Sequence, residues 1–351
     1  MVLLLAGSVG QCWSKVDWLK IKHWIDSADV AGCDTSYVRL PREGFIGNLA
    51  ITETGTYAHL RYGVHSSDGD LIYLSGPFST QQAGMLSAGV SYRGWGLSYT
   101  RDLSKHGDTE WNFCTYGQTY GAEFRIHHSN SMSGSLDDPR TSSLYDDVVV
   151  DVEQCRQHTI LANIYYVFNH KRFSLPAAMS NTVIQRRNSG SFMACVNFRR
   201  ADTHLADGAL SVLIGGNSAD ADFGNGVFRK LRQSQFSIGG GYAYNWVFAN
   251  RHLLLHGSMM PMMSVWHYNR ATYQITVRDA MGYVTDSYTW RKELNQNVSF
   301  NASAHFALIH NASRYVSGLI GLINYDSLLG TDHFGVYTVD WSAKLFFGIR
   351  F

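Results

Sequence analysis

The sequence predicts an all-β fold: a single transmembrane up-and-down antiparallel β-barrel of about 12 strands, with a range of roughly 10–14. Three features of the 351-residue chain support this prediction. The last residues alternate between apolar and polar side chains, and many earlier segments do the same. The composition also favours strands, with 20 Tyr, 18 Phe, 9 Trp and 33 Gly against 5 Pro. No run of about 18 apolar residues occurs, which excludes helical membrane spans.

The carboxyl-terminal strand is the clearest element. One face of residues 337–351 carries apolar side chains and the other polar ones, with Phe346 the single exception. A two-residue period is that of a β-strand. The segment resembles the final strand of bacterial outer-membrane barrels. That resemblance implies a location in the bacterial outer membrane and a signal for the barrel-assembly machinery at Phe347, Ile349 and Phe351.

Counting back from this strand gives twelve expected segments. In a barrel the apolar face of each strand meets lipid and the polar face lines the lumen. The alternative is a soluble β-sandwich or barrel, in which the apolar face points to the core. Segment lengths favour the membrane barrel, because about 9–11 residues of strand cross a bilayer. The expected strands are 45–63, 70–78, 83–92, 95–103, 109–129, 147–168, 190–200, 235–248, 251–267, 290–309, 313–325 and 336–351.

The connections are expected to differ between the two ends of the barrel, with short turns in the periplasm and long loops outside. The expected extracellular loops are 130–146, 201–234, 268–289 and 326–335, and the expected periplasmic turns are 79–82, 104–108, 249–250 and 310–312.

One connection on the periplasmic side, residues 169–189, is unusually long. It carries the basic residues Lys171, Arg172, Arg186 and Arg187 around an apolar stretch at 175–178. It folds into the lumen as a partial plug or forms a solvated periplasmic loop. In both cases its arginines are expected at an inward or periplasmic contact.

The amino-terminal region is expected to precede the barrel. Residues 1–10 resemble the end of a secretory signal peptide, with cleavage expected before Gln11. Residues 11–43 then form an arm, and residues 44–351 form the barrel. Between Trp13 and Ala28 the apolar residues recur at helical spacing, so the arm is expected to be short and either helical or irregular.

Charge and cysteine content exclude several classes of function. A net charge of +1 indicates no nucleic-acid partner. The five cysteines lack Cys-x-x-Cys spacing, so neither a metal site nor a cofactor is expected. The expected partners are outer-membrane lipid and the assembly machinery.

His127 and Ser129 are the candidates for catalysis. Their His-x-Ser order resembles outer-membrane phospholipase A and the lipid A deacylases, which implies that Ser129 attacks an acyl ester and His127 takes its proton. The strand phase argues against this role, because both side chains should face the lumen, where no phospholipid lies. We therefore expect a protein that is not an enzyme, with an acyl-ester hydrolase as the alternative.

Charged and histidine side chains are expected to line the lumen. His252 and His256 share a strand face but lie about 13 Å apart at the rise of a strand, too far to bind one metal ion together. Charges of both signs indicate no strong ion preference. The expected lumen residues are Glu123, Arg125, Arg199, His252, His256, His305, Asp340, Lys344 and Arg350.

Four stretches, at 34–37, 89–94, 165–178 and 346–351, resemble an uncharacterised family of outer-membrane barrels of Gram-negative bacteria. The resemblance covers roughly residues 34–351, and residues 169–178 (Asn-His-Lys-Arg-Phe-Ser-Leu-Pro-Ala-Ala) are its most specific part. It implies the fold and the location, and it assigns no catalytic residue. The expected function is a narrow or gated pore, or a membrane scaffold for partners.

Overall fold

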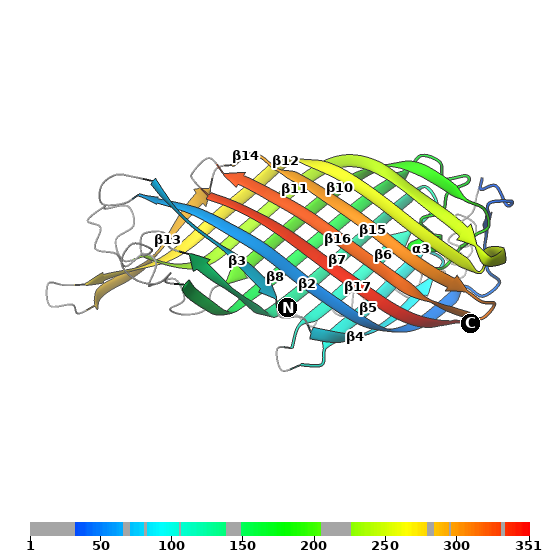
Figure 1. Cartoon of the computed structure of the whole chain (residues 1–351), viewed down its shortest axis with the longest axis horizontal. Coiled ribbons are helices and arrows are strands. Elements are labelled where there is room, and N and C mark those ends of the chain that lie inside the picture. Colours follow the sequence, from blue (N-terminus) through cyan, green and yellow to red (C-terminus); the bar gives the residue numbers. More distant parts are fainter. Residues whose placement is uncertain are drawn as a thin grey trace, which may run out of the picture.

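The computed structural model describes residues 32–65, 71–80, 83–104, 107–137, 149–204, 226–278, 284–294, 296–330 and 334–351. The expected signal peptide and the helical part of the arm lie outside these ranges. Within them the chain forms a closed antiparallel barrel of twelve wall strands, so the predicted fold is confirmed (Figure 1). The barrel closes where the last strand pairs with the first.

Each wall strand pairs with its two neighbours around the ring, and the second wall strand has two parts. In order they are β2 (Phe45–His65), β3 (Leu71–Thr80) with β4 (Ala83–Tyr92), β5 (Trp95–Asp102), β6 (Thr109–Tyr116), β7 (Tyr120–Asp137), β8 (Val149–Val167), β10 (Ser189–His204), β11 (Gly226–Phe248), β12 (Leu253–Arg278), β15 (Phe300–Asn311), β16 (Tyr315–Gly330) and β17 (Phe334–Arg350).

Two segmentation errors cancel in the predicted strand count. Residues 70–78 and 83–92 were expected as two strands, but β3 and β4 pair with successive halves of β2 and so form one wall strand. Residues 109–129 were expected as one strand, but the chain reverses after β6, where Gly117 N–H donates to the Tyr120 carbonyl at 2.9 Å. The change of phase between Phe113 and Gly121 was the sequence signal of this turn.

The placement of two turns was also wrong. The turn at Arg93 and Gly94 lies at the carboxyl-terminal end of the barrel, because Tyr92 pairs with Phe45, which bonds to Phe351. Both turn residues have positive φ (46° and 89°), as a two-residue hairpin requires. The connection between β5 and β6, expected in the periplasm at 104–108, therefore lies on the far side, and residues 79 and 80 of the other expected turn belong to β3 in the wall.

The strand 290–309 was expected to be continuous and is not. The far half of β12 pairs with β13 (Val284–Leu294), which extends beyond the wall, while the near half pairs with β15. A short strand, β14 (Gln296–Val298), pairs with β16 between them. The β12–β13 hairpin projects from the left end of the barrel in Figure 1.

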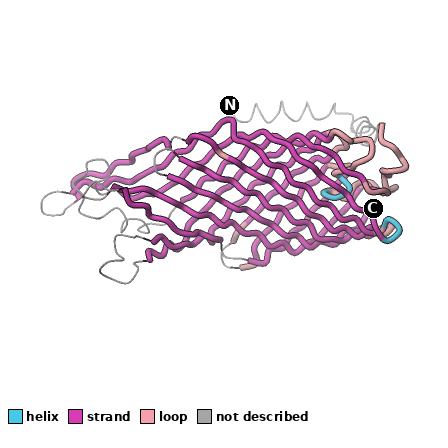
Figure 2. The backbone as a smooth tube through the Cα atoms, turned by 45° about the horizontal axis from the view of Figure 1, so that its top comes forward, coloured by secondary structure: helices cyan, strands magenta, loops and turns pink. Residues whose placement is uncertain are grey.

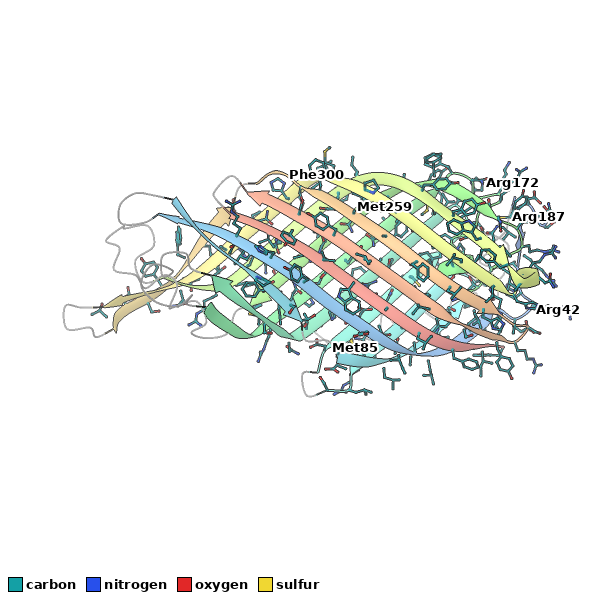
Figure 3. The ribbon with its side chains drawn as sticks, viewed as in Figure 1. Arg42, Met85, Arg172, Arg187, Met259 and Phe300 are labelled. Carbon is teal, nitrogen blue, oxygen red and sulfur yellow. The ribbon has the colours of Figure 1, made fainter. Side chains whose placement is uncertain are left out.

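The apolar face of the strands points outward, as predicted. Leu345 and Phe351 are 61% and 67% exposed, and Met259 and Phe300 lie on the outer surface in Figure 3. Phe346, the exception to the alternation of the last strand, is only 5% exposed and faces the lumen. It packs there in a cluster with Ala177 and Ala178.

Candidate functional site

The connection between β8 and β10 folds into the lumen and forms a plug, defined as residues 169–188. Of the two expected arrangements, the structure has the plug. It contains one turn of helix, α3 (Pro176–Met179), and a short strand, β9 (Ile184–Gln185). β9 pairs with β1 (Val38–Arg39) of the arm. Figures 1 and 2 place α3 inside the carboxyl-terminal end of the barrel.

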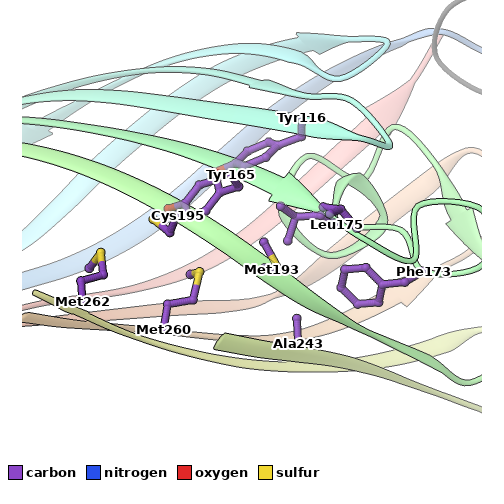
Figure 4. Close-up of a cluster of buried hydrophobic side chains, with 10 residues drawn as sticks. Tyr116, Tyr165, Phe173, Leu175, Met193, Cys195, Ala243, Met260 and Met262 are labelled. Carbon is purple, nitrogen blue, oxygen red and sulfur yellow. The ribbon is translucent and has the colours of Figure 1, made fainter. Parts of the chain in front are cut away.

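Apolar side chains hold the plug against the inner wall. Phe173 and Leu175 are 0% and 1% exposed, and they pack with Tyr165, Met193 and Met260 of the wall (Figure 4). Burying a Phe or Leu side chain stabilises a fold by about 1.5–3 kcal/mol. The inward face of the wall is apolar where it contacts the plug, whereas elsewhere it carries mainly polar side chains.

A chain of buried side-chain amides fixes the plug in position. Gln185 Oε1 accepts from Ser174 N–H at 2.9 Å, and its Nε2 donates to the Arg172 carbonyl at 2.7 Å. Asn245 of β11 donates to the Ser174 carbonyl at 2.8 Å, and its Oδ1 is 2.7 Å from Nδ1 of His256. Because an amide oxygen can only accept, Nδ1 of His256 carries the proton. These bonds satisfy plug backbone groups that water cannot reach.

Arg350 ties the plug to the barrel seam. Its side chain is 2% exposed, and its guanidinium donates to the Asn181 carbonyl at 3.2 Å and to Asn311 Oδ1 at 2.6 Å. Asn181 has a positive φ of 59°, which reverses the chain after α3. The expected lumen residue Arg350 is therefore a plug contact.

The basic residues of the plug lie at the mouth, outside the lumen. The guanidinium groups of Arg172 and Arg187 lie 5.2 and 5.6 Å from the Tyr37 ring, and Figure 3 shows both at the carboxyl-terminal end. Arg186 donates to the Thr35 carbonyl at 3.1 Å, and Lys171 is exposed. The arm and the plug thus cover the mouth together.

Asp34 joins the arm to the plug. Its N–H donates to the Lys171 carbonyl at 2.9 Å, and its carboxylate lies 3.9 Å from Arg172. Hydrogen bonds from the hydroxyl and N–H of Ser36 lower the pKa of the Asp34 carboxyl, and Arg172 adds to the effect. The carboxylate therefore stays ionised at neutral pH.

A cavity of about 130 Å³, lined by both polar and apolar side chains, lies next to the plug, with room for several water molecules. Met179, Ser180 and Asn181 form its floor, and Lys344 and Cys114 are among the side chains on its wall. Buried polar atoms that line it without a hydrogen-bond partner among the described residues are Asn48 Oδ1, Thr52 Oγ1, Asn112 Oδ1, Glu123 Oε2 and Asn181 Oδ1.

Two further cavities continue along the lumen, separated by ion pairs. Arg125 lies between Glu110 (3.8 Å) and Glu123 (3.1 Å), and both Arg125 and Glu110 also line a second cavity of about 30 Å³. Arg199 pairs with Asp326 at 3.1 Å and with Asp340 at 2.9 Å. It lines both the second cavity and a third of about 10 Å³.

The expected lumen residues therefore face the lumen, except for His252. His305 is 3% exposed and stacks edge-on against Tyr165. His252 is exposed in the turn after η1 (Ala249–Arg251), where its ring bonds to the Asn311 carbonyl. The assignment of His252 was wrong because the strand begins one residue later, at Leu253.

The two candidate catalytic residues lie on the inner side of β7. His127 lines the second cavity. Ser129 is 1% exposed, and its hydroxyl donates to Asp108 Oδ2 at 3.0 Å, while Asn130 N–H donates to Oδ1 of the same carboxylate at 2.7 Å. A nucleophile must present its oxygen to a substrate. This serine instead helps to fix the β5–β6 turn against β7.

Among the described residues, no group of three or more His, Cys, Asp or Glu side chains is placed to hold a metal ion. Four cysteines, at 33, 114, 155 and 195, form no disulfide. In the described part of the chain, no helix is both long and apolar enough to cross a membrane.

Sequence reasoning missed the residues that complete the site. Glu110 and Asp326 pair with predicted lumen arginines, and their inward phase could have identified them. Gln185 and Asn245 form hydrogen bonds to backbone groups of the plug, but no sequence pattern identifies a buried amide side chain. Their roles depend on where the plug folds.

Fold and site together define a plugged membrane β-barrel of the outer-membrane type. Over residues 33–351 the chain matches the family described as "Domain of unknown function (DUF4421)", and it belongs to that family. The predicted resemblance to an uncharacterised barrel family is thereby confirmed. No curated protein matches the chain.

Solved structures similar to this chain are outer-membrane proteins. The outer membrane protease OmpT from Escherichia coli is 10% identical with a TM-score of 0.44, over 89% of this chain and 98% of that one. The attachment invasion locus protein Ail of Yersinia pestis is 9% identical with a TM-score of 0.23, over 86% and 98%. The P. putida toluene transporter TodX is 9% identical with a TM-score of 0.27, over 88% and 90%. Such distant likeness assigns no function.

Proposed function

We propose that the protein is a gated pore of the bacterial outer membrane, held closed at its periplasmic mouth by the plug. The observation that carries the proposal is the series of three cavities along the lumen, each with charged side chains in its lining, the first of which ends on the plug. A membrane scaffold needs no polar path through its interior. A pore needs one, with a barrier that can move.

The plug can leave without opening the wall. β8 and β10, which flank it in sequence, pair with each other directly from Val167 and Met193 onward. The plug is therefore an insertion at the end of a hairpin whose wall pairing does not depend on it. Its displacement breaks the bonds from Asn245 to Ser174 and Gln185 and the contact between Arg350 and Asn181, and it leaves the closed ring of strands intact.

The two ion-pair clusters act as constrictions on the same path. Arg125 with its two glutamates and Arg199 with its two aspartates separate the cavities. Each cluster contains both signs of charge, so a small solute of either sign meets an attractive and a repulsive group. The proposed permeant is a small polar solute, and selectivity between anions and cations is weak.

The test is conductance in a planar lipid bilayer. Replacing residues 170–188 by a short Gly-Ser turn removes the plug and keeps β8 paired with β10. The unaltered protein is expected to conduct rarely, and the plugless variant to conduct continuously. An Arg199→Ala substitution should raise the conductance of the plugless variant and change little in the plugged protein.

The control is a Ser313→Ala variant, which alters an exposed turn at the same end and should conduct like the unaltered protein. A plugless variant that forms the barrel and still carries no current would overturn the pore. The scaffold would then be the better account, because the lumen would be closed by the wall side chains themselves.

A further inference from the structure

A basic patch lies on the outer face of three adjacent strands, facing away from the lumen. It consists of Arg156 on β8, Arg200 on β10, and Lys230 and Arg232 on β11. Strand register fixes the direction of these side chains. Ala201, between the outward positions of β10, is fully buried on the inner side, whereas the Arg200 side chain is 38% exposed.

A carboxylate at the centre organises the patch. Asp202 lies 2.7 Å from Arg232 Nε, 3.2 Å from Arg200 Nη2 and 3.8 Å from Lys230 Nζ. One negative charge thus holds three cations in place. Arg156 lies in the next row, opposite His204, and it brings the patch to four cations and one anion, which leaves a net positive charge.

The patch begins where the apolar surface ends. Phe198, Phe236 and Trp266 pair across β10, β11 and β12, and they form the last row in which all three strands carry an outward aromatic side chain; in the next row only β12 does, with Tyr268. Moving away from the carboxyl-terminal end of the barrel, the next outward row contains Arg200. The row after that contains Asp202 paired with Arg232.

The height of the apolar surface fits a membrane. On β11 the outward aromatic and aliphatic residues run from Phe248 to Phe236. Twelve steps of about 3.3 Å, at a strand tilt of roughly 40°, give a band about 30 Å tall. That is the thickness of the hydrocarbon core of a bilayer. The basic patch therefore lies at headgroup level, on the side away from the plug.

We propose that this patch binds the phosphate groups of a glycolipid in the outer leaflet. The inference rests on the membrane placement given under the proposed function, but not on conduction. Guanidinium groups bind phosphate oxygens in pairs, and a phosphate would contact Arg200, Arg156 and Lys230 on the side that Asp202 leaves open. The acyl chains of the same molecule would lie along Ile160, beside Arg200, and along Phe198 and Phe236 in the row below.

A lipid fits this position better than a soluble anion does. The patch is continuous with the apolar band, so one ligand with a charged head and apolar tails contacts both surfaces at once. A soluble phosphate would gain only the charge contacts, which salt screens at an exposed site. Along the outer surface an aromatic row is followed by rows that carry cations, and in a lipid the apolar tails are followed by the charged headgroup in the same order.

The test is binding of purified barrel in detergent to three probes: bisphosphorylated lipid A, the same lipid A with its phosphates removed, and inorganic phosphate. The variant carries Arg156→Gln, Arg200→Gln and Lys230→Gln, and it keeps Arg232 to pair with Asp202. Each cation near a lipid surface contributes about 1 kcal/mol, so the variant should bind bisphosphorylated lipid A at least about tenfold more weakly.

A matched control carries Arg39→Gln, Arg42→Gln and Arg314→Gln, the same loss of charge among exposed residues at the opposite end. It should bind like the unaltered protein. Equal affinity for lipid A with and without phosphate would overturn the proposal, and so would an equal loss in the control. Stronger binding of inorganic phosphate than of the lipid would show a soluble-anion site instead. Because none of these outcomes depends on current through the lumen, failure here is distinct from failure of the pore.

Discussion

At the scale of single residues, the plug depends on buried amides whose hydrogen-bonding groups are all used locally. Asn245 satisfies a plug carbonyl and the N–H of a buried histidine with one side chain. Leaving a buried donor or acceptor without a partner costs about 1–3 kcal/mol. Single substitutions here should therefore loosen the plug without changing the wall.

Asn245→Ala is expected to lower the free energy of unfolding by about 1–3 kcal/mol, because it leaves the Ser174 carbonyl and His256 Nδ1 unpaired. Urea unfolding in detergent measures the loss, and hydrogen exchange should rise across residues 173–185. The matched control is Asn197→Ala, which breaks a lumen bond to Asn163 away from the plug. If plug exchange rises equally in both variants, the amide does not anchor the plug.

Residue-level prediction from the sequence succeeded where the strand phase alone decided the outcome. Glu123, Arg199 and Asp340 face the lumen because each lies at an inward position of a regular strand. The phase of His252 was extrapolated beyond the strand end, and the prediction failed there. Phe346 broke the alternation for a reason invisible in its own strand, since its partners are the alanines of α3.

At the scale of elements, the arm and the plug form one cover, joined by the β1–β9 pairing and by Asp34. The lowered pKa of the Asp34 carboxyl gives this joint a pH dependence. A carboxyl whose pKa is lower in the folded state contributes stability above its ordinary value, 3.8, and loses it as the pH falls through the folded value. The joint should weaken only in acid.

The accessibility of Cys33 reports on this joint, because its thiol bonds to the His170 carbonyl at 3.7 Å. Its modification by 4,4′-dithiodipyridine, followed by mass spectrometry, is expected to be slow at about pH 7 and faster once the pH falls below the folded pKa of Asp34, which lies under 3.8. Asp34→Asn should make the modification equally fast at both pH values, and the change should be modest because the Asp34 side chain is 39% exposed. A pH profile that is the same in Asp34→Asn would exclude this carboxyl as the cause.

The element count was predictable, and the element boundaries were less so. A period of two finds strands, but it does not distinguish a kinked strand from two strands, as β3 and β4 show. Nor does a change of phase, such as that between β6 and β7, tell a three-residue turn from an irregularity within one strand. Both cases are resolved by knowing which strands pair with each other, and this pairing is visible only in the closed barrel.

At the scale of the whole molecule, the direction of the barrel decides which end meets the cell exterior. The plug, the arm and the carboxyl terminus lie at one end, and the β12–β13 hairpin extends from the other (Figure 1). We therefore expect Asp286→Cys to be labelled by a membrane-impermeant maleimide on intact cells. Ser313→Cys should be labelled only after the outer membrane is permeabilised, and the unaltered protein serves as background. The reverse pattern would invert the proposed orientation.

The fold followed from the sequence because alternation and aromatic content act over the whole chain. The site could not be predicted in the same way, because the plug forms through contacts between residues distant in the sequence. The chain enters the lumen at 169–188 since its apolar residues match an apolar patch of the inner wall, contributed by strands distant in sequence. The length and composition of the loop pointed to a plug without deciding it.

The Arg350 contact has a consequence for how the barrel is built. Arg350 is the penultimate residue of the chain, and it bonds to Asn181 in the plug. That bond can form only after the final strand has been delivered, when β17 zips onto β2 and the ring shuts. The plug therefore gains this contact only in a closed ring, so pairing of β17 with β2 and seating of the plug stabilise each other.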